Sequence, residues 1–67
     1  MDTKVVYEIL NSALSGQKYC IIKTLNEHYC FNFTSGRIES IENIILIDNE
    51  KSMTYIYCPS IISIQIS

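Results

Sequence analysis

The first part of the chain repeats its apolar side chains with the period of an α-helix. Spacings of three, four and seven recur among Val5, Val6, Ile9, Leu10, Ala13 and Leu14. This stripe predicts a helix over about residues 4–15, because residues three and four apart share one face of a helix. Asp2 or Thr3 can cap its first turn, and Gly16 can end it by adopting a positive φ.

After the glycine the period shortens to two, which is typical of strands with one buried face. Short β-prone runs predict five strands, over about residues 19–25, 29–40, 44–48, 53–58 and 61–66. The longest of them places Tyr29, Phe31 and Phe33 on one face. Ser35-Gly36 interrupts that run, and a glycine inside a strand marks a sharp bend or a bulge.

The last two strands meet at Pro59-Ser60, where proline fixes φ and removes a hydrogen-bond donor. In the final run, Ile62, Ile64 and Ile66 are expected to face one way, while Ile61 and the polar residues face the other. A polar turn over residues 48–52 precedes these strands.

Five short strands in about 48 residues are too few for two stacked sheets of useful size. The expected fold is therefore mainly β: one domain over residues 1–67, with the helix laid across the open end of one small, strongly bent barrel. Such a barrel leaves the edges of the last two strands exposed, and exposed apolar edges aggregate unless they are paired. Head-to-tail pairing between copies closes into a ring. The predicted subunit interface comprises Met53, Tyr55, Ile56, Tyr57, Ile61, Ile62, Ile64 and Ile66.

The size of the chain supports this expectation, because 67 residues bury only about 60% of their unfolded surface and need additional stabilisation. Three cysteines (Cys20, Cys30 and Cys58) are odd in number and lack the spacing of a disulfide framework. One histidine, His28, makes no metal site with them. Partner subunits remain as the stabilising device.

No secretory signal or membrane-length apolar run is found, so we expect a cytoplasmic protein with reduced thiols and no membrane partner. The net charge of −2, from five Lys/Arg and seven Asp/Glu, gives no basic field for strong, non-specific binding to nucleic acid. No nucleophile, carboxylate pair or metal site indicates catalysis. We therefore expect no enzyme activity and no cofactor.

Residues 36–46, Gly-Arg-Ile-Glu-Ser-Ile-Glu-Asn-Ile-Ile-Leu, resemble the G-x-I-E-S-F-D-Q-F-V-I-L segment of the bacterial Hfq branch of the Sm-like family. Residues 53–62 fall where that family carries M-V-Y-K-H-A-I-S, with Tyr57 on the family's tyrosine. Residues 10–14 are similar to its F-L-N-x-L. The resemblance implies an amino-terminal helix, a five-stranded Sm-like (SH3-like) β-barrel, a homo-oligomeric ring of six copies, and RNA binding.

The departures from the family affect its RNA site. Its pore lysine and histidine are replaced by Cys58 and Pro59, and its base-stacking aromatic by Ile44. Its arginine-rich rim is replaced by Ser-Gly-Gln-Lys at residues 15–18. Stacking is worth about 1–3 kcal/mol per base, so binding of uridine-rich RNA is expected to be severely weakened.

Five tyrosines offer amphipathic contact area, either to the barrel core and subunit interface or to a planar ligand. Tyr55 and Tyr57 share one strand face, and Asn49 and Lys51 in the preceding turn can add polar contacts. These four residues form the predicted ligand site.

Two functions remain open. The first is a non-enzymatic, Hfq-like regulator whose ring binds short RNA or a nucleotide. The alternative is a phage-type or regulatory interaction protein that sequesters a signal nucleotide or a host protein and has no RNA-chaperone activity.

Overall fold

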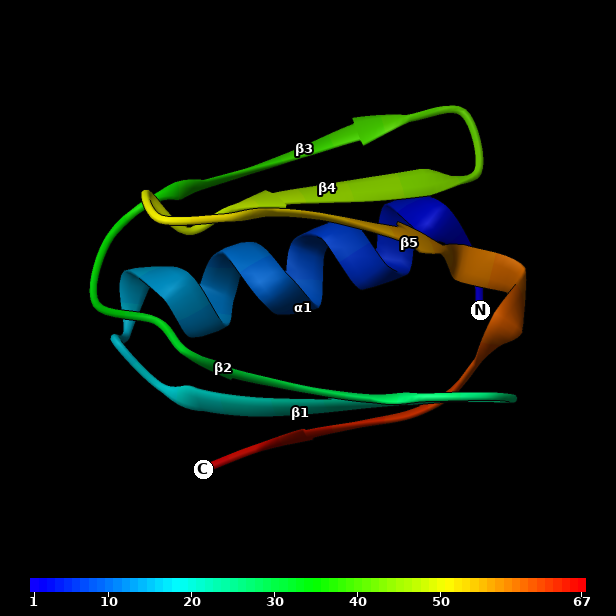
Figure 1. Cartoon of the computed structure of the whole chain (residues 1–67), viewed down its shortest axis with the longest axis horizontal. Helices are drawn as coiled ribbons and strands as arrows, with labels where there is room; N and C mark the ends of the chain where they lie inside the picture. Colours follow the sequence, from blue (N-terminus) through cyan, green and yellow to red (C-terminus); the bar gives the residue numbers. More distant parts are fainter.

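The computed structural model describes residues 1–67 as one helix and six strands, which confirms a mainly β chain with an amino-terminal helix (Figure 1). The elements are α1 (Thr3–Ser15), β1 (Tyr19–Thr24), β2 (His28–Asn32), β3 (Arg37–Ile41), β4 (Ile44–Asp48), β5 (Met53–Tyr57), the 3-10 turn η1 (Cys58–Ser60) and β6 (Ile61–Ile66).

Helix α1 begins where the Asp2 carboxylate accepts a 2.7 Å hydrogen bond from the amide of Lys4, which satisfies one free donor of the first turn. It ends at Gly16, but the predicted positive φ is wrong for this residue, whose φ is −86°. Gln17, at +52°, takes the left-handed conformation instead. The left-handed residue that follows the helix is therefore Gln17, one position after the predicted Gly16.

The strands form two three-stranded antiparallel sheets, β2-β1-β6 and β3-β4-β5, and neither sheet closes into a barrel. The prediction of one closed five-stranded barrel is therefore wrong. The long strand predicted over residues 29–40 is two strands, because the chain bends at residues 33–36 and Gly36 has a φ of +114°. The bend sends β2 and β3 into different sheets.

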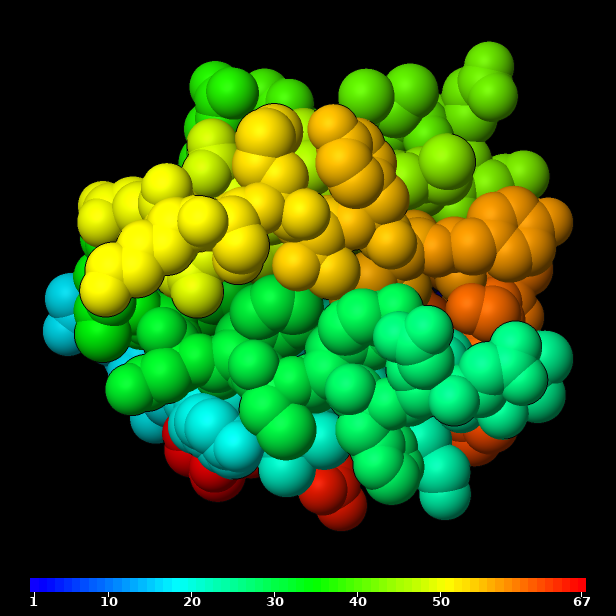
Figure 2. Space-filling view, viewed as in Figure 1, coloured from blue at the N-terminus to red at the C-terminus, as the bar shows by residue number.

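The helix and the inner faces of both sheets enclose one core. Figure 1 shows β3-β4-β5 at the top, β2-β1-β6 at the bottom and α1 crossing between them, and α1 contacts β3, β4, β1 and η1. On the face seen in Figure 2, β5 (yellow to orange) lies directly above β2 (green), although no hydrogen-bonded ladder joins these two strands. The core cluster comprises Val6, Leu10, Ala13, Cys20, Ile22, Phe31, Phe33, Ile38, Ile45, Ile47, Ile56, Cys58 and Ile61.

An irregularity in β6 changes the predicted alternation of its side chains. The pairing of β6 with β1 shifts between Lys23 and Thr24, so that Ser63 pairs with Lys23 but Ile61 pairs with Thr24. Ile62 is the extra residue of this bulge and is 53% exposed, whereas Ile61 is buried. Ile61 and Ile64 therefore both contact the core, and the expectation that Ile62 and Ile64 share a face opposite Ile61 is wrong.

The single helix lacks the length and the apolar character that a membrane crossing requires.

Candidate functional site

Strands β5 and β6 each stand at the edge of a sheet and have a hydrogen-bonded neighbour on one side only. Five residues form β5 and six form β6, and the short turn η1 places the two strands in different sheets. Each strand therefore carries backbone donors and acceptors along its second side that no other strand of this chain pairs.

Strand register arranges the outer side of β3-β4-β5 as three rows that cross the sheet. The first row is Arg37, Asp48 and Met53, the second is Glu39, Leu46 and Tyr55, and the third is Ile41, Ile44 and Tyr57. We call these nine residues the outward face. The alternate residues of the same strands, which include Ile45, Ile47 and Ile56, point into the core.

Large apolar side chains dominate two thirds of the outward face. The exposed fractions are 57% for Ile41, 38% for Ile44, 53% for Met53, 61% for Tyr55 and 56% for Tyr57. Leu46, at the centre, is only 5% exposed although it does not belong to the core cluster. The outward face thus has a buried apolar side chain at its centre and five exposed apolar side chains along part of its border.

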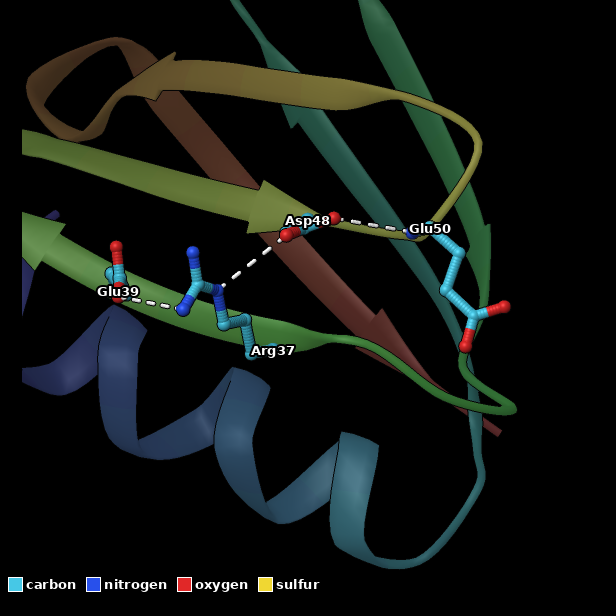
Figure 3. A network of polar contacts seen from close by, with 4 residues as sticks. All are labelled: Arg37, Glu39, Asp48 and Glu50. Carbon is cyan, nitrogen blue, oxygen red and sulfur yellow. Dashed lines mark hydrogen bonds and ion pairs between the residues drawn. The ribbon is translucent and has the colours of Figure 1, made fainter.

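The remaining part of the outward face is charged, and its two carboxylates outnumber its one cation. Figure 3 shows Arg37 between two carboxylates, with Nη1 3.6 Å from Glu39 Oε1 and Nε 3.5 Å from Asp48 Oδ2. Asp48 Oδ1 also accepts a 3.2 Å hydrogen bond from the amide of Glu50. Arg37 therefore offers little free positive charge to a phosphate.

The structure brings together only part of the predicted ligand site. Tyr55 and Tyr57 are neighbours on the outward face, two residues apart on β5. Asn49 and Lys51 lie in the turn before β5, where the amide of Lys51 donates to the carbonyl of Asn49 at 2.6 Å. This turn adjoins Met53, at the opposite end of the strand from Tyr57.

The residues predicted at the subunit interface fall into two groups. Exposed members are Met53, Tyr55, Tyr57, Ile62 and Ile66, and Ile64 is partly buried against the core. The side chains of Ile56 and Ile61 are buried in the core of the same chain. Those two residues have only their backbone to offer to another copy.

Sequence reasoning did not assign Ile41 and Ile44 to an accessible surface, because an unbroken apolar run resembles a strand buried on both faces. The available signal was the two-residue turn Glu42-Asn43, since it fixes the register of β3 and β4. With Ile41 opposite Ile44, the outer members of the run can be identified.

Two hollows lie beside α1. One of about 480 Å³ separates the start of α1 from the β3–β4 hairpin, and its lining mixes Lys4 with Asp2 and Glu42. The other, of about 410 Å³, lies between α1 and β6 and is lined in part by Ile9, Ala13 and Ile66. Neither contains a residue of the predicted ligand site.

Thiol and phenol groups show the only clear perturbations of acidity. Burial, and then the neighbouring Cys30, raise the pKa of Cys20 to about 11. A side-chain hydrogen bond with Cys30 raises the pKa of Tyr19, and one with Glu27 raises that of Tyr29. No three His, Cys, Asp or Glu side chains are grouped to hold a metal ion. The thiol and the two phenols are protonated at neutral pH even at their ordinary pKa values, so the upward shifts matter only at alkaline pH.

No protein-family model, curated protein sequence or solved structure matches this chain. The resemblance to the Sm-like family stays a prediction that rests on the residues quoted for it.

Proposed function

We propose that this chain is a non-enzymatic binding module of the Sm-like kind, which assembles with itself by pairing β5 of one copy with β6 of the next. Strands β2 and β3 form one edge of each sheet, and the observation that carries the proposal is that the consecutive strands β5 and β6 form the other two edges. Their lengths match, at about 17 Å and about 20 Å for five and six residues.

The assembly covers strand edges and apolar side chains that are unfavourable to leave exposed in the single chain. Exposed Ile62 and Ile66 flank one open edge, and exposed Met53, Tyr55 and Tyr57 flank the other. Pairing the two edges satisfies their backbone groups and covers part of this apolar surface. Because the two edges differ, the contact is head-to-tail and generates a ring when its rotation closes. The resemblance to Hfq supports six copies, in the cytoplasm.

For the ligand we propose a planar group, such as the base of a nucleotide or of a short RNA, stacked on Tyr55 or Tyr57. Both rings are more than half exposed and lie on the same face. The net charge of −2 and the paired state of Arg37 favour a mononucleotide or very short RNA over a long one.

A second candidate is the sequestration of a protein. The observation that favours it is the group of five exposed apolar side chains on the outward face, because contiguous apolar surface of this kind marks interaction sites. This function needs neither a base-stacking ring nor positive charge.

Native mass spectrometry of freshly purified protein tests the assembly. Wild-type protein is expected to contain more than two copies of the 7.7 kDa chain. The double variant Ile62→Lys/Ile66→Lys is expected to contain two copies at most, because lysines along an edge oppose strand pairing. Leu25→Lys, at a turn residue that is 72% exposed, is the matched control and should keep the wild-type mass. An unchanged mass in the double variant would rule out the β5–β6 contact.

Equilibrium dialysis against adenosine and uridine monophosphate tests the ligand. Tyr57→Ala should weaken binding about five-fold or more, given the stacking energy of one base. Tyr19→Ala, at an exposed tyrosine outside the outward face, should leave the affinity unchanged. Absence of binding to wild-type protein, together with a protein captured through Tyr57 and Ile44, would favour sequestration.

A further inference from the structure

The outward face concentrates apolar surface to a degree that the rest of the molecule does not. Of the eleven exposed large hydrophobic residues in the chain, five belong to its nine positions. The other six are spread over α1, β1, β6, the β1–β2 turn and the amino terminus. Single exposed apolar residues are ordinary on a protein surface, but a contiguous group is not.

The distribution across the outward face is uneven. The row Ile41, Ile44 and Tyr57 is wholly apolar, whereas the row at the other end contains the ion pair of Arg37 and Asp48. The middle row has the buried Leu46 at its centre. One end of the face is therefore apolar and the other is charged.

We propose that the outward face packs against the outward face of a second copy, around a two-fold axis that runs along β4. Under this symmetry, the apolar row of one copy lies on the apolar row of the other. Ile44 meets Ile44 of the second copy, and Ile41 meets Tyr57 of the second copy. Two sheets stacked in this way lie about 10 Å apart with their strands nearly aligned.

The alternative two-fold axis, across the strands, gives a worse contact. It would place Ile41, Ile44 and Tyr57 of each copy over the charged row of the other. The ion pair of Arg37 and Asp48 would then lose water without gaining a polar partner, which costs free energy. With the axis along β4, the charged rows lie together at one rim of the contact, where water reaches them. Asp48 then lies opposite Asp48 of the second copy, and Arg37 of its own copy offsets part of that repulsion.

The area of the outward face is sufficient for this contact. At roughly 200 Å² for a fully exposed large apolar side chain, its five exposed members present about 500 Å² per copy. Two copies bury about 1,000 Å², and this is the size at which specific interfaces begin. Arg37 and Glu39, whose side chains are 64% and 47% exposed, add to the rim.

A long phosphate backbone finds no free cation on the outward face, because the one cation there lies between two carboxylates. A self-complementary face needs no second protein, since each apolar row finds its match in another copy. The inference goes beyond the proposed ring, because it uses side chains of one sheet face where the ring uses backbone edges. It also covers Tyr55 and Tyr57, so a face that packs in this way does not stack a base at the same time.

Charge pairs at position 44 test the axis directly. Ile44→Lys alone and Ile44→Glu alone should each halve the wild-type mass in native mass spectrometry, because like charges meet across the axis. An equimolar mixture of the two variants should restore the wild-type mass with both chains present in equal number. Leu25→Lys is the matched control. Circular dichroism checks folding. If a position-44 variant does not fold, Ile41→Lys, at a residue 57% exposed, tests disruption alone, because it sets a charge against Tyr57 of the second copy.

The outcomes separate this inference from the proposed ring. If Ile62→Lys/Ile66→Lys leaves a two-copy species that Ile44→Lys converts to single chains, the face-to-face contact stands. If the Ile44 variants keep the full wild-type mass, or if the mixture fails to restore it, the face-to-face contact is wrong and the ring is untouched. A bound RNA or foreign protein that Ile44→Lys releases without changing the copy number would also overturn the inference.

Discussion

Gly36 and Asp48 approach each other so closely that a side chain at position 36 has no room. A Cβ atom built on Gly36 would lie against the carbonyl oxygen of Asp48, well inside the 3.0 Å that real Cβ atoms keep. The φ of Gly36 is +114°, in a region that other residues rarely adopt. This contact joins the bend between β2 and β3 to the end of β4, so it fixes how the first sheet passes into the second.

Gly36→Ala should therefore lower the free energy of unfolding by about 3 kcal/mol or more, through the combined cost of the clash and the strained φ. Urea denaturation measures the change. Gly16→Ala is the matched control: its φ is −86° and the nearest atom is the flexible end of Lys18, at 3.3 Å. That variant should stay within about 1 kcal/mol of wild type. Equal losses at the two glycines would contradict the role assigned to position 36.

The local elements were predictable from the sequence because their signals are local. The predicted helix over residues 4–15 and the strands over residues 44–48 and 61–66 agree with α1, β4 and β6 to within one residue. The aromatic alternation of residues 29–33 also holds, with Phe31 and Phe33 in the core and Tyr29 packed against it. Apolar periods of 3.6 and 2 residues indicate which side chains are buried in a helix and in a strand. These elements were predictable because burial of one face determines their pattern.

The arrangement between elements was predicted less well, because it depends on contacts far apart in the chain. Sequence alternation cannot show that Ile62 bulges out of β6, since the bulge is defined by the pairing with β1. It also missed the split of the long strand into two sheets, although Gly36 was recognised as a bend. Ile44 was considered only as a substituted stacking residue, while its register opposite Ile41 and Tyr57 places it within an apolar row.

The ion pairs of Arg37 are expected to contribute little to stability. The Arg37 side chain is 64% exposed, and its two contacts are 3.5 and 3.6 Å long. Exposed pairs of this kind are worth about 0–1 kcal/mol, so Arg37→Gln should change the free energy of unfolding by less than about 1 kcal/mol. Urea denaturation in low salt and in about 1 M salt should give nearly the same difference between variant and wild type. A loss of several kcal/mol would mean that Arg37 supports the sheet in a way these contacts do not explain.

The three thiols should differ sharply in reactivity. Cys30 is exposed on β2, whereas Cys20 and Cys58 are 0% exposed within the core. Ellman's reagent should titrate one thiol per folded chain rapidly, and the other two only as the chain opens. Cys30→Ser should abolish the rapid phase, and denaturation in urea should expose all remaining thiols. Two rapid thiols in the wild-type protein would show that the core around Cys20 or Cys58 opens easily.

Alkaline pH should destabilise the fold through Cys20. Burial raises the pKa of this thiol from 9.0 to about 11, so the folded chain keeps the proton that the unfolded chain loses. Below pH 9 both states are protonated and the stability is full. Between pH 9 and 11 the stability falls, by at most about 1.4 kcal/mol per pH unit. The raised pKa values of Tyr19 and Tyr29 act in the same direction above pH 10.

Urea denaturation between pH 7 and pH 10.5 measures how the free energy of unfolding changes with pH. Cys20→Ala should flatten this slope, even though the variant is less stable at every pH. An unchanged slope in Cys20→Ala would mean that the thiol ionises as easily in the folded chain as in the unfolded one.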